Sequence, residues 1–581
     1  MLAEEHRSEL RDGMRIDWDI PIVMDDGVVL RADLFRPPEG KHPVILSYGP
    51  YAKGLAFQEG YVSAWQRLTG DHPEVLAHSS GKYMNWETVD PERWVPDGYA
   101  CLRIDSRGAG RSPGYLDPRS PREIEDIYQS IEWAAVQPWC SGKVGMCGIS
   151  YYASNQWQVA AKQPPHLAAC CIWEGSSDVY REQARHGGIL CTFRQHWYDM
   201  QVKSVQHGRG ERGPRNPLTG DLVCGPETLT DEELAKNRID VGQAHYEHLL
   251  RDEFYVARQA DFAKITVPLL SAGNWGGAGL HLRGNVEGFL QIASEHKWLE
   301  MHGLEHWTEF YTDYGLAIQK RFFARFLKDD ASQFPDAPRV CLQVRGVDKF
   351  EPREENEWPL ARTQWTPFYL DLRTRALRRQ PQGDDTLTYD ALGDGVTFVS
   401  DPLTEETEIT GPSALKLSLS SSTKDADVFA VLRAFAPSGA EVVFQGAIDP
   451  HTPLAQGWLR VSHRKRDPGR TTPYRPWHPH DALRPLREGE IAELDIEIWP
   501  TCIVLPPGYC IALTLRGKDY EYTGASGGRL SNFKNEMRGC GPFLHDDPRD
   551  RPPEIFGGKI TLHTSTSNPA YVLLPIVPPK E

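Results

Sequence analysis

The fold is decided by the stretch Val144-Gly145-Met146-Cys147-Gly148-Ile149-Ser150-Tyr151-Tyr152, which places a serine where an apolar strand should turn sharply into a helix. The G-x-S-x-G pattern of such turns keeps small residues beside the serine, so that the strained backbone projects the hydroxyl and the helix packs close behind it. Gly148 and Ser150 fit this pattern, but Tyr152 stands where the second glycine is expected. The stretch suggests a nucleophilic serine, and the rest of the chain has to supply its partners.

Short apolar runs and helical spacings alternate on both sides of this turn. Strands are expected at 28–35, 43–48, 99–105, 144–147, 167–173, 267–272 and 297–301, and helices at 124–137, 154–162 and 314–327. Strands that alternate with helices form βαβ units and a parallel sheet. This part of the chain is therefore predicted to be an α/β-hydrolase domain, with Ser150 at the carboxyl end of a central strand.

Two further regions lose this rhythm. Residues 179–253 are rich in His, Arg, Gln and Gly, with short helices expected near 231–237 and 244–251, and they are interpreted as a helical cap inserted over the sheet. After Asp336 alternating apolar runs between Pro and Gly turns predict an all-β sandwich of jelly-roll type. The expected organisation is an α/β-hydrolase domain in two parts (1–178 and 254–335), a cap (179–253) and a jelly-roll domain (336–581).

Composition excludes several classes of partner. The 581 residues are 40% hydrophobic and 25% charged, with a formal net charge of −16, as in an ordinary soluble globular protein. This acidic balance argues against nucleic acids and anionic membranes, which require basic patches. The N-terminus is charged, and no apolar run approaches the ~20 residues of a membrane span. We expect a soluble, cytoplasmic protein with a small-molecule or peptide substrate, and leave open whether it forms a homo-oligomer.

The cysteines and histidines do not predict a metal site or a cofactor. Several of the eleven cysteines, such as Cys147 and Cys170, lie inside apolar strand-like runs, where thiols behave as small hydrophobic groups. There is no C-x-x-C pair, and His302 with His306 lacks the H-E-x-x-H pattern. The cysteines are therefore assigned to packing.

A serine is a weak nucleophile until a base takes its proton, so Ser150 needs a histidine from a loop after a later strand. His302 and His306 follow the strand expected at 297–301, and His306, deeper in the loop, is the better candidate. The oxyanion of a tetrahedral intermediate needs two donors. The backbone N–H of Tyr151 is one candidate, and the phenol of Tyr51, in the loop after an early strand, is the other.

These residues resemble the cocaine esterase and X-Pro dipeptidyl-peptidase family of serine hydrolases, which includes α-amino-acid ester hydrolases, and the resemblance spans nearly the whole chain. The segments that carry it are Gly49-Pro50-Tyr51-Ala52-Lys53, Asp105-Ser106-Arg107-Gly108-Ala109-Gly110, the serine turn with Trp139 to Lys143 before it, Gly457-Trp458-Leu459-Arg460, and Thr423-Lys424-Asp425-Ala426-Asp427. The resemblance implies the oxyanion role of Tyr51 and tolerance of a bulky residue at Tyr152.

One departure concerns the acid of the triad. The family usually places an aspartate in a W-x-D pattern after the strand at 267–272, and this chain has Trp275-Gly276-Gly277 there. A carboxylate after the preceding strand, Glu174 or Asp178, is one replacement, and Glu174 is preferred. Asn274 is a neutral alternative that would hold the imidazole by a hydrogen bond, and a Ser–His dyad is the third.

The leading hypothesis is a serine hydrolase that cleaves an ester or amide bond of a small molecule through an acyl-enzyme, with Ser150, His306 and Glu174 as the triad. An X-Pro dipeptidyl-peptidase acting on peptides is the alternative, and it requires a carboxylate near the pocket for the free amino group. A hypothesis of another class, motivated by Gly277, is a binding protein built on a catalytically impaired hydrolase scaffold.

Overall fold

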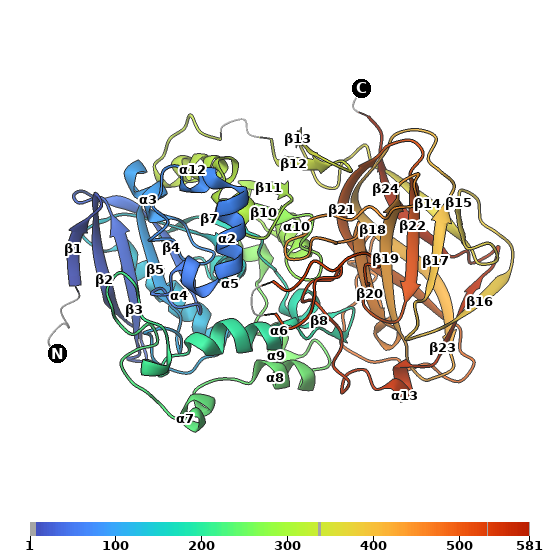
Figure 1. Cartoon of the computed structure of the whole chain (residues 1–581), viewed down its shortest axis with the longest axis horizontal. Helices are drawn as coiled ribbons and strands as arrows, with labels where there is room; N and C mark the ends of the chain where they lie inside the picture. Colours follow the sequence, from blue (N-terminus) through green and yellow to red (C-terminus); the bar gives the residue numbers. More distant parts are fainter. Residues whose placement is uncertain (1–6, 335–337, 531–532, 580–581) are drawn as a thin grey trace.

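The computed structural model describes residues 7–334, 338–530 and 533–579, in which two large β-sheets lie side by side (Figure 1). The first sheet has the order β1-β2-β3-β5-β4-β6-β7-β10-β11-β12-β13. Its strands are β1 (Arg7–Arg11), β2 (Met14–Val23), β3 (Val29–Arg36), β4 (His42–Gly49), β5 (Ala100–Asp105), β6 (Cys140–Ile149), β7 (Leu167–Trp173), β10 (Leu269–Asn274), β11 (Lys297–His302), β12 (Val340–Arg345) and β13 (Phe350–Glu355).

The strands from β5 to β12 in this order pair in parallel, so their carboxyl ends meet at one edge of the sheet. Helices cover both faces: α4 (Pro121–Ala135) and α5 (Tyr151–Ala161) share one core with the sheet, and α12 (Asp313–Leu327) packs in another. A further helix, α10 (Leu282–Gln291), follows β10. The predicted βαβ order is confirmed, and the strand expected at 167–173 has those bounds in the structure.

The sheet extends beyond the boundary expected at residue 335. Strand β12 pairs with β11 in parallel, and β13 pairs with β12 antiparallel. Their alternating pattern made them indistinguishable from strands of the following domain, because period-two spacing does not reveal which sheet a strand joins.

The segment between β7 and β10 contains short elements over the carboxyl edge of the sheet. They include the π-helix η3 (Val179–Ala184), the hairpin β8 (Arg185–His186) and β9 (Ile189–Leu190), and the helices α6 (Phe193–Trp197), α7 (Asp231–Lys236), α8 (Val241–Glu247) and α9 (Glu253–Val256). Helices were expected near α7 and α8. The hairpin was not expected, since each of its strands has only two residues.

The C-terminal part is all-β and contains a barrel. Its sheet has the order β16-β23-β18-β21-β20-β19-β22-β17-β15-β14-β24, and a further pairing of β18 with β24 closes it. The strands are β14 (Gln364–Asp371), β15 (Ala376–Arg378), β16 (Asp385–Asp390), β17 (Val396–Ser400), β18 (Thr407–Ser421), β19 (Asp427–Phe435), β20 (Ala455–Arg460), β21 (Ala492–Leu505), β22 (Cys510–Arg516), β23 (Lys559–Thr564) and β24 (Tyr571–Val577). The jelly-roll order stays a prediction.

Loops of this β domain reach the first sheet near α6 and α10 (Figure 1). Thr192 N–H, just before α6, donates to the carbonyl oxygen of Leu544 at 2.8 Å. Within the described residues, no helix has both the length and the apolar character needed to cross a bilayer.

Candidate active site

Ser150 lies at the sharp turn between β6 and α5. Its backbone has φ 58° and ψ −108°, a conformation that residues with a side chain rarely adopt. The Ser150 N–H donates to the carbonyl of Trp173 at 3.1 Å, and the adjacent Ile149 N–H donates to that of Glu87 at 3.0 Å. The surrounding backbone therefore holds the strained turn in place, as expected where strain serves a site.

The structure explains how Tyr152 replaces the second glycine of the motif. A Cβ on Gly148 would lie 2.4 Å from the Tyr152 Cβ, and a Cβ on Gly49 would lie 2.7 Å from the edge of the Tyr152 ring. The space freed by these two glycines holds the ring. Gly49, at the end of β4, thus provides the small residue that the motif usually places two positions after the serine.

Ser150 contacts a histidine that the sequence analysis had not selected. His281, at the N-terminus of α10, has its Nε2 at 3.1 Å from the Ser150 Oγ. On the other side of the ring, the Ser176 N–H donates to Nδ1 at 3.1 Å. Because Nδ1 accepts this bond, the neutral ring carries its proton on Nε2 and donates it to the serine. Burial, followed by the charge on His306, moves the pKa of His281 well below its usual value.

His306 lies beside His281, with the rings stacked at 5.5 Å between centroids and 14° between planes. Its Nδ1 lies 2.7 Å from the Glu174 Oε2, and its Nε2 lies 2.9 Å from the Glu87 Oε1. Burial alone would lower the pKa of His306, but the charge of Glu174 and the bonds to both carboxylates outweigh it and raise the pKa to about 10. Here His306 is an imidazolium that donates to two carboxylates, and its Nε2 does not face Ser150.

Glu174 contacts polar groups at the ends of β10 and β11 and in the loop after β11. It directly follows β7 with φ 51°, and its N–H donates to the carbonyl of Ala272. Its Oε1 accepts from His302 Nε2 at 3.1 Å and from Asn274 Nδ2 at 3.1 Å. Burial would raise the pKa of Glu174, but His306 and His302 lower it to about 2. The residue is therefore an ionised carboxylate aimed at the imidazole of His306.

The other expected orienters of the histidine lie elsewhere. Asn274 donates to Glu174 and to the Leu304 carbonyl, so it supports the carboxylate and does not hold the imidazole. Asp178 forms an ion pair with Arg181 at 2.5 Å and caps η3. Gly277 lines the same pocket as Ser150, and a Cβ there would lie 3.1 Å from the Asn274 carbonyl oxygen. Neither Asn274 nor Asp178 therefore contacts the imidazole of His306 in the way the sequence suggested.

Both predicted oxyanion donors border the serine. Tyr51 lines the pocket, and its oxygen accepts a hydrogen bond from Trp197 Nε1 at 2.9 Å, which leaves the phenolic hydrogen to donate. Burial moves the pKa of Tyr51 well above its usual value, so the phenol keeps that hydrogen. The Tyr151 N–H is the first amide of α5, a position with no partner inside the helix.

The pocket over Ser150 has a volume of about 50 Å³ and a strongly apolar lining drawn from all parts of the chain. Its polar side chains are Glu87, Ser150, Gln201, His281 and His306. Its aromatic side chains are Tyr51, Tyr61, Trp86, Phe193, Trp197, Trp307, Phe533 and Phe543, the last two from the β domain. The site is therefore built jointly by the sheet, the segment after β7 and the C-terminal domain.

Sequence reasoning missed His281 and Glu87. The signal for His281 was its place in the loop after β10, which borders the site in this fold. Glu87 lies in a long connection before β5 with φ 64°, and no local pattern distinguishes it from other loop carboxylates.

Comparisons with known proteins give the family and the fold of the chain. Residues 26–308 match the family model of X-Pro dipeptidyl-peptidase (S15 family), and residues 332–572 match that of the X-Pro dipeptidyl-peptidase C-terminal non-catalytic domain. A CocE/NonD family hydrolase from Staphylococcus aureus is 31% identical, with a TM-score of 0.82 over 97% of this chain and 94% of its own. Cocaine esterase from Rhodococcus sp. is 24% identical over 96% of this chain and 98% of its own. An α-amino acid ester hydrolase at 17% identity and a TM-score of 0.65, covering 96% of each chain, shares the fold.

Proposed function

The chain belongs to the cocaine esterase and X-Pro dipeptidyl-peptidase (S15) family of hydrolases, and from that premise we propose that it cleaves a small ester or amide through an acyl-enzyme on Ser150. The observation that carries the proposal is the strained Ser150 in a pocket where a buried histidine, His306, meets an ionised Glu174 at 2.7 Å. A strained nucleophile turn and a carboxylate-oriented imidazole are the parts that acyl transfer requires.

In the proposed mechanism, His306 is the general base. Its Nε2 proton must first pass to Glu87, and burial raises the pKa of this carboxylate, which lowers the cost of the transfer. The neutral imidazole then turns Nε2 toward Ser150, takes the serine proton during attack on the carbonyl carbon, and returns it to the leaving group. Glu174 holds Nδ1 throughout and stabilises the imidazolium that forms. His281 cannot take this role in its present tautomer, because its Nε2 already carries a proton.

The oxyanion of the tetrahedral intermediate is assigned to the Tyr51 phenol and the Tyr151 N–H. Both are fixed before the substrate arrives: Tyr51 by the bond from Trp197, and Tyr151 by its place at the start of α5. Donors fixed in advance stabilise developing charge without reorganising during the reaction. The aromatic lining favours an apolar or aromatic acyl group, because apolar pockets bind such groups by desolvation.

Covalent labelling tests the nucleophile. An aryl phosphonate should add one adduct per chain, and mass spectrometry of the intact protein should find none on Ser150→Ala. The matched control is Ser154→Ala, one turn along α5, whose hydroxyl bonds Ser176 and which should label normally. Absence of labelling in the wild type, or equal labelling of Ser150→Ala, contradicts the proposal. The same results separate it from an impaired scaffold that only binds ligands.

An aminopeptidase-like activity on X-Pro peptides is the second candidate, and Glu87 favours it. Its carboxylate lines the pocket, and its Oε2 has no hydrogen-bond partner among the described residues. A substrate ammonium that pairs with Glu87 would also release His306 Nε2 toward the serine. Ala-Pro and Gly-Pro anilides, compared with aryl esters lacking an amino group, distinguish the two substrate classes. A Glu87→Gln variant should lose activity selectively on the anilides if this candidate is right.

A further inference from the structure

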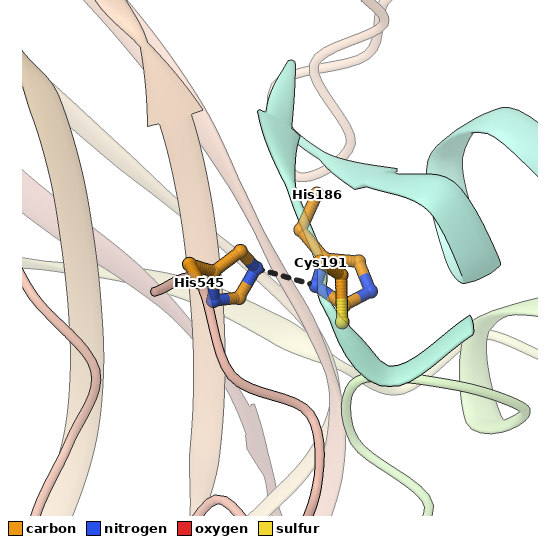
Figure 2. A group of neighbouring side chains, drawn as sticks. All are labelled: His186, Cys191 and His545. Atoms are coloured by element: carbon orange, nitrogen blue, oxygen red, sulfur yellow. Dashed lines mark hydrogen bonds between the residues drawn. The ribbon is translucent and has the colours of Figure 1, made fainter. Parts of the chain in front are cut away.

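A second group of buried side chains lies away from the serine, where the hairpin β8–β9 meets the β domain (Figure 2). It consists of His186 on β8, Cys191 just after β9, and His545 from a loop of the β domain, all three buried. One ligand atom from each lies within 4.8 Å of the other two. The three residues come from positions up to 359 apart in the sequence, which explains why no spacing motif revealed them.

The two rings direct one nitrogen each toward the other, His186 Nδ1 and His545 Nε2. His545 donates Nδ1–H to Asp519 Oδ1 at 2.7 Å, and His186 Nε2 lies 3.3 Å from the Glu182 carbonyl, which can only accept. If both outer nitrogens carry the proton, the inner ones, His186 Nδ1 and His545 Nε2, both present lone pairs at 2.8 Å. A metal ion between these two lone pairs would bind both rings, whereas without a metal a proton on His186 Nδ1 joins the rings by one N–H···N bond.

From this geometry we propose that His186, Cys191 and His545 form a binding site for a thiophilic divalent transition-metal ion, for which Zn²⁺ is the natural probe. Imidazole nitrogens and a thiolate sulfur are the donors that zinc prefers. Metal-bound histidines almost always donate their other N–H to a carboxylate or carbonyl, which is the arrangement that Asp519 and the Glu182 carbonyl already supply. With Zn–N bonds of about 2.05 Å in tetrahedral geometry, the two nitrogens would separate to about 3.3 Å, a small adjustment of the rings.

Charge balance favours a divalent ion. On binding, the Cys191 thiol loses its proton to solvent and becomes a thiolate, so Zn²⁺, the thiolate and the Asp519 carboxylate sum to zero. A buried neutral group of this kind needs no further counter-ion. Three protein ligands leave one coordination position of zinc for water or for an added ligand.

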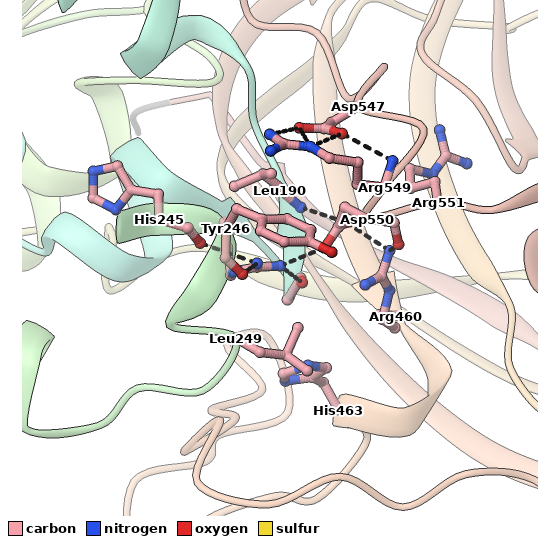
Figure 3. A network of polar contacts seen from close by, with 12 residues as sticks. Leu190, His245, Tyr246, Leu249, Arg460, His463, Asp547, Arg549, Asp550 and Arg551 are labelled. Carbon is pink, nitrogen blue, oxygen red and sulfur yellow. Dashed lines mark hydrogen bonds and ion pairs between the residues drawn. The ribbon is translucent and has the colours of Figure 1, made fainter. Parts of the chain in front are cut away.

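A network of ion pairs holds the hairpin in position for this site (Figure 3). Asp550 accepts from Arg185 Nη1 at 2.8 Å, from Arg460 Nη2 at 2.9 Å and from the Leu190 N–H at 3.1 Å. Arg185 and Leu190 are the chain neighbours of His186 and Cys191, and they pair across the hairpin. The two hairpin ligands are therefore placed against the β domain before any metal binds. The ion would join the segment after β7 to that domain, two residues before the pocket residue Phe193.

Metal content measured on tag-free full-length protein tests the proposal. After chelator treatment and dialysis, the wild type should take up one Zn²⁺ per chain, and its melting temperature should rise with zinc concentration. Loading with Co²⁺ should give a thiolate-to-metal charge-transfer band. Cys191→Ser should lose the band, and both Cys191→Ser and His545→Gln should lose the stoichiometric zinc.

Two control variants match these substitutions. Cys224→Ser removes another buried free thiol, and His463→Gln removes a member of a second buried histidine pair, whose Nδ1 atoms lie 3.0 Å apart. Both should bind zinc as the wild type does. Asp519→Asn keeps all three ligands and should weaken zinc binding about 10- to 100-fold. This variant still tests the site if a ligand variant fails to fold. The proposal is overturned if the wild type binds no stoichiometric zinc. It is also overturned if Cys191→Ser and Asp519→Asn bind zinc as tightly as the wild type. These readouts do not depend on hydrolytic activity, so they are independent of the proposed function.

Discussion

Two buried histidines in different regions of this molecule, His306 and His463, differ in charge. In the serine pocket, His306 lies between Glu174 and Glu87, and its pKa rises to about 10 although burial opposes this. Where the β domain meets the segment after β7, His463 and His480 contact each other through Nδ1, and burial lowers the pKa of His463 to about 3. Both rings are buried, so the two carboxylates bonded to His306, and not the depth of burial, account for the difference between His306 and His463.

Removing the carboxylate that distinguishes the pocket should have the largest effect. Glu174→Gln should reduce kcat by about 10⁴-fold, because the imidazole loses the group that fixes its tautomer and stabilises its cation. Steady-state kinetics on an aryl ester measure the loss. Glu300→Gln is the matched control: this buried carboxylate contacts His302 Nδ1 at 2.6 Å but has no bond to His306. Equal losses in the two variants would contradict the role given to Glu174.

The same variant has a pH signature in stability. Glu174 has a pKa lowered from 4.5 to about 2, so its contribution is present above pH 4.5 and is lost as the pH falls through about 2. His306 has a pKa raised from 6.5 to about 10, so its contribution is present below pH 6.5 and is lost as the pH rises through about 10. The melting-temperature deficit of Glu174→Gln should therefore be largest between about pH 4.5 and 6.5 and should shrink toward pH 10.

Loss of the phenolic donor should have the next largest effect. Tyr51→Phe keeps the ring packing and removes one oxyanion donor, so kcat should fall by about 10²- to 10³-fold with little change in KM. Tyr61→Phe is the matched control, since this ring stacks on Trp86 in the same pocket. A Tyr51→Phe enzyme with wild-type kcat would exclude the phenol from the oxyanion site.

His281 provides the sharpest test of which histidine is the base, because it is the one bonded to Ser150 here. His281→Gln should lower kcat only about five- to tenfold, the effect of losing one neutral hydrogen bond to the serine. A loss as large as that of Ser150→Ala would transfer the role of base to His281, and the charge difference between the two regions would then have no catalytic meaning.

Glu87→Gln should have the smallest effect on maximal turnover of an uncharged ester and a clear effect on its pH dependence. With one carboxylate fewer, the pKa of His306 falls, so the neutral base is available at lower pH. The lower limb of the kcat/KM profile should therefore move to lower pH, by about one unit or more. An unchanged profile, beside a shifted one for Glu174→Gln, would show that Glu87 does not restrain His306.

The elements of the first sheet were predictable because local signals agreed with the global fold. Apolar runs bounded by turns located β4, β6, β7 and β11, and the contact of Glu174 with His306 follows from the ends of β7 and β11, which lie on either side of β10. Contacts between distant loops could not be predicted from the sequence. The bonds of His306 to Glu87 and of His281 to Ser150 depend on side-chain directions that no periodicity encodes. The group of His186, Cys191 and His545 was missed for the same reason. The sequence of a strand such as β12 likewise does not show which sheet the strand joins.

Because Gly49 is small, the large ring of Tyr152 fits beside it, and this limits how the two residues of the turn can change in evolution. A side chain on Gly49 would overlap the Tyr152 ring, with 2.7 Å to the nearest carbon. A return to the glycine-flanked motif by Tyr152→Gly would leave a void beside position 49, where a larger residue would fit. Each single step therefore damages the turn, and the two sites are expected to change together or not at all. Homologues with a small residue after the nucleophile should carry a bulkier one at the end of β4, a covariation that links two positions about a hundred residues apart in the chain.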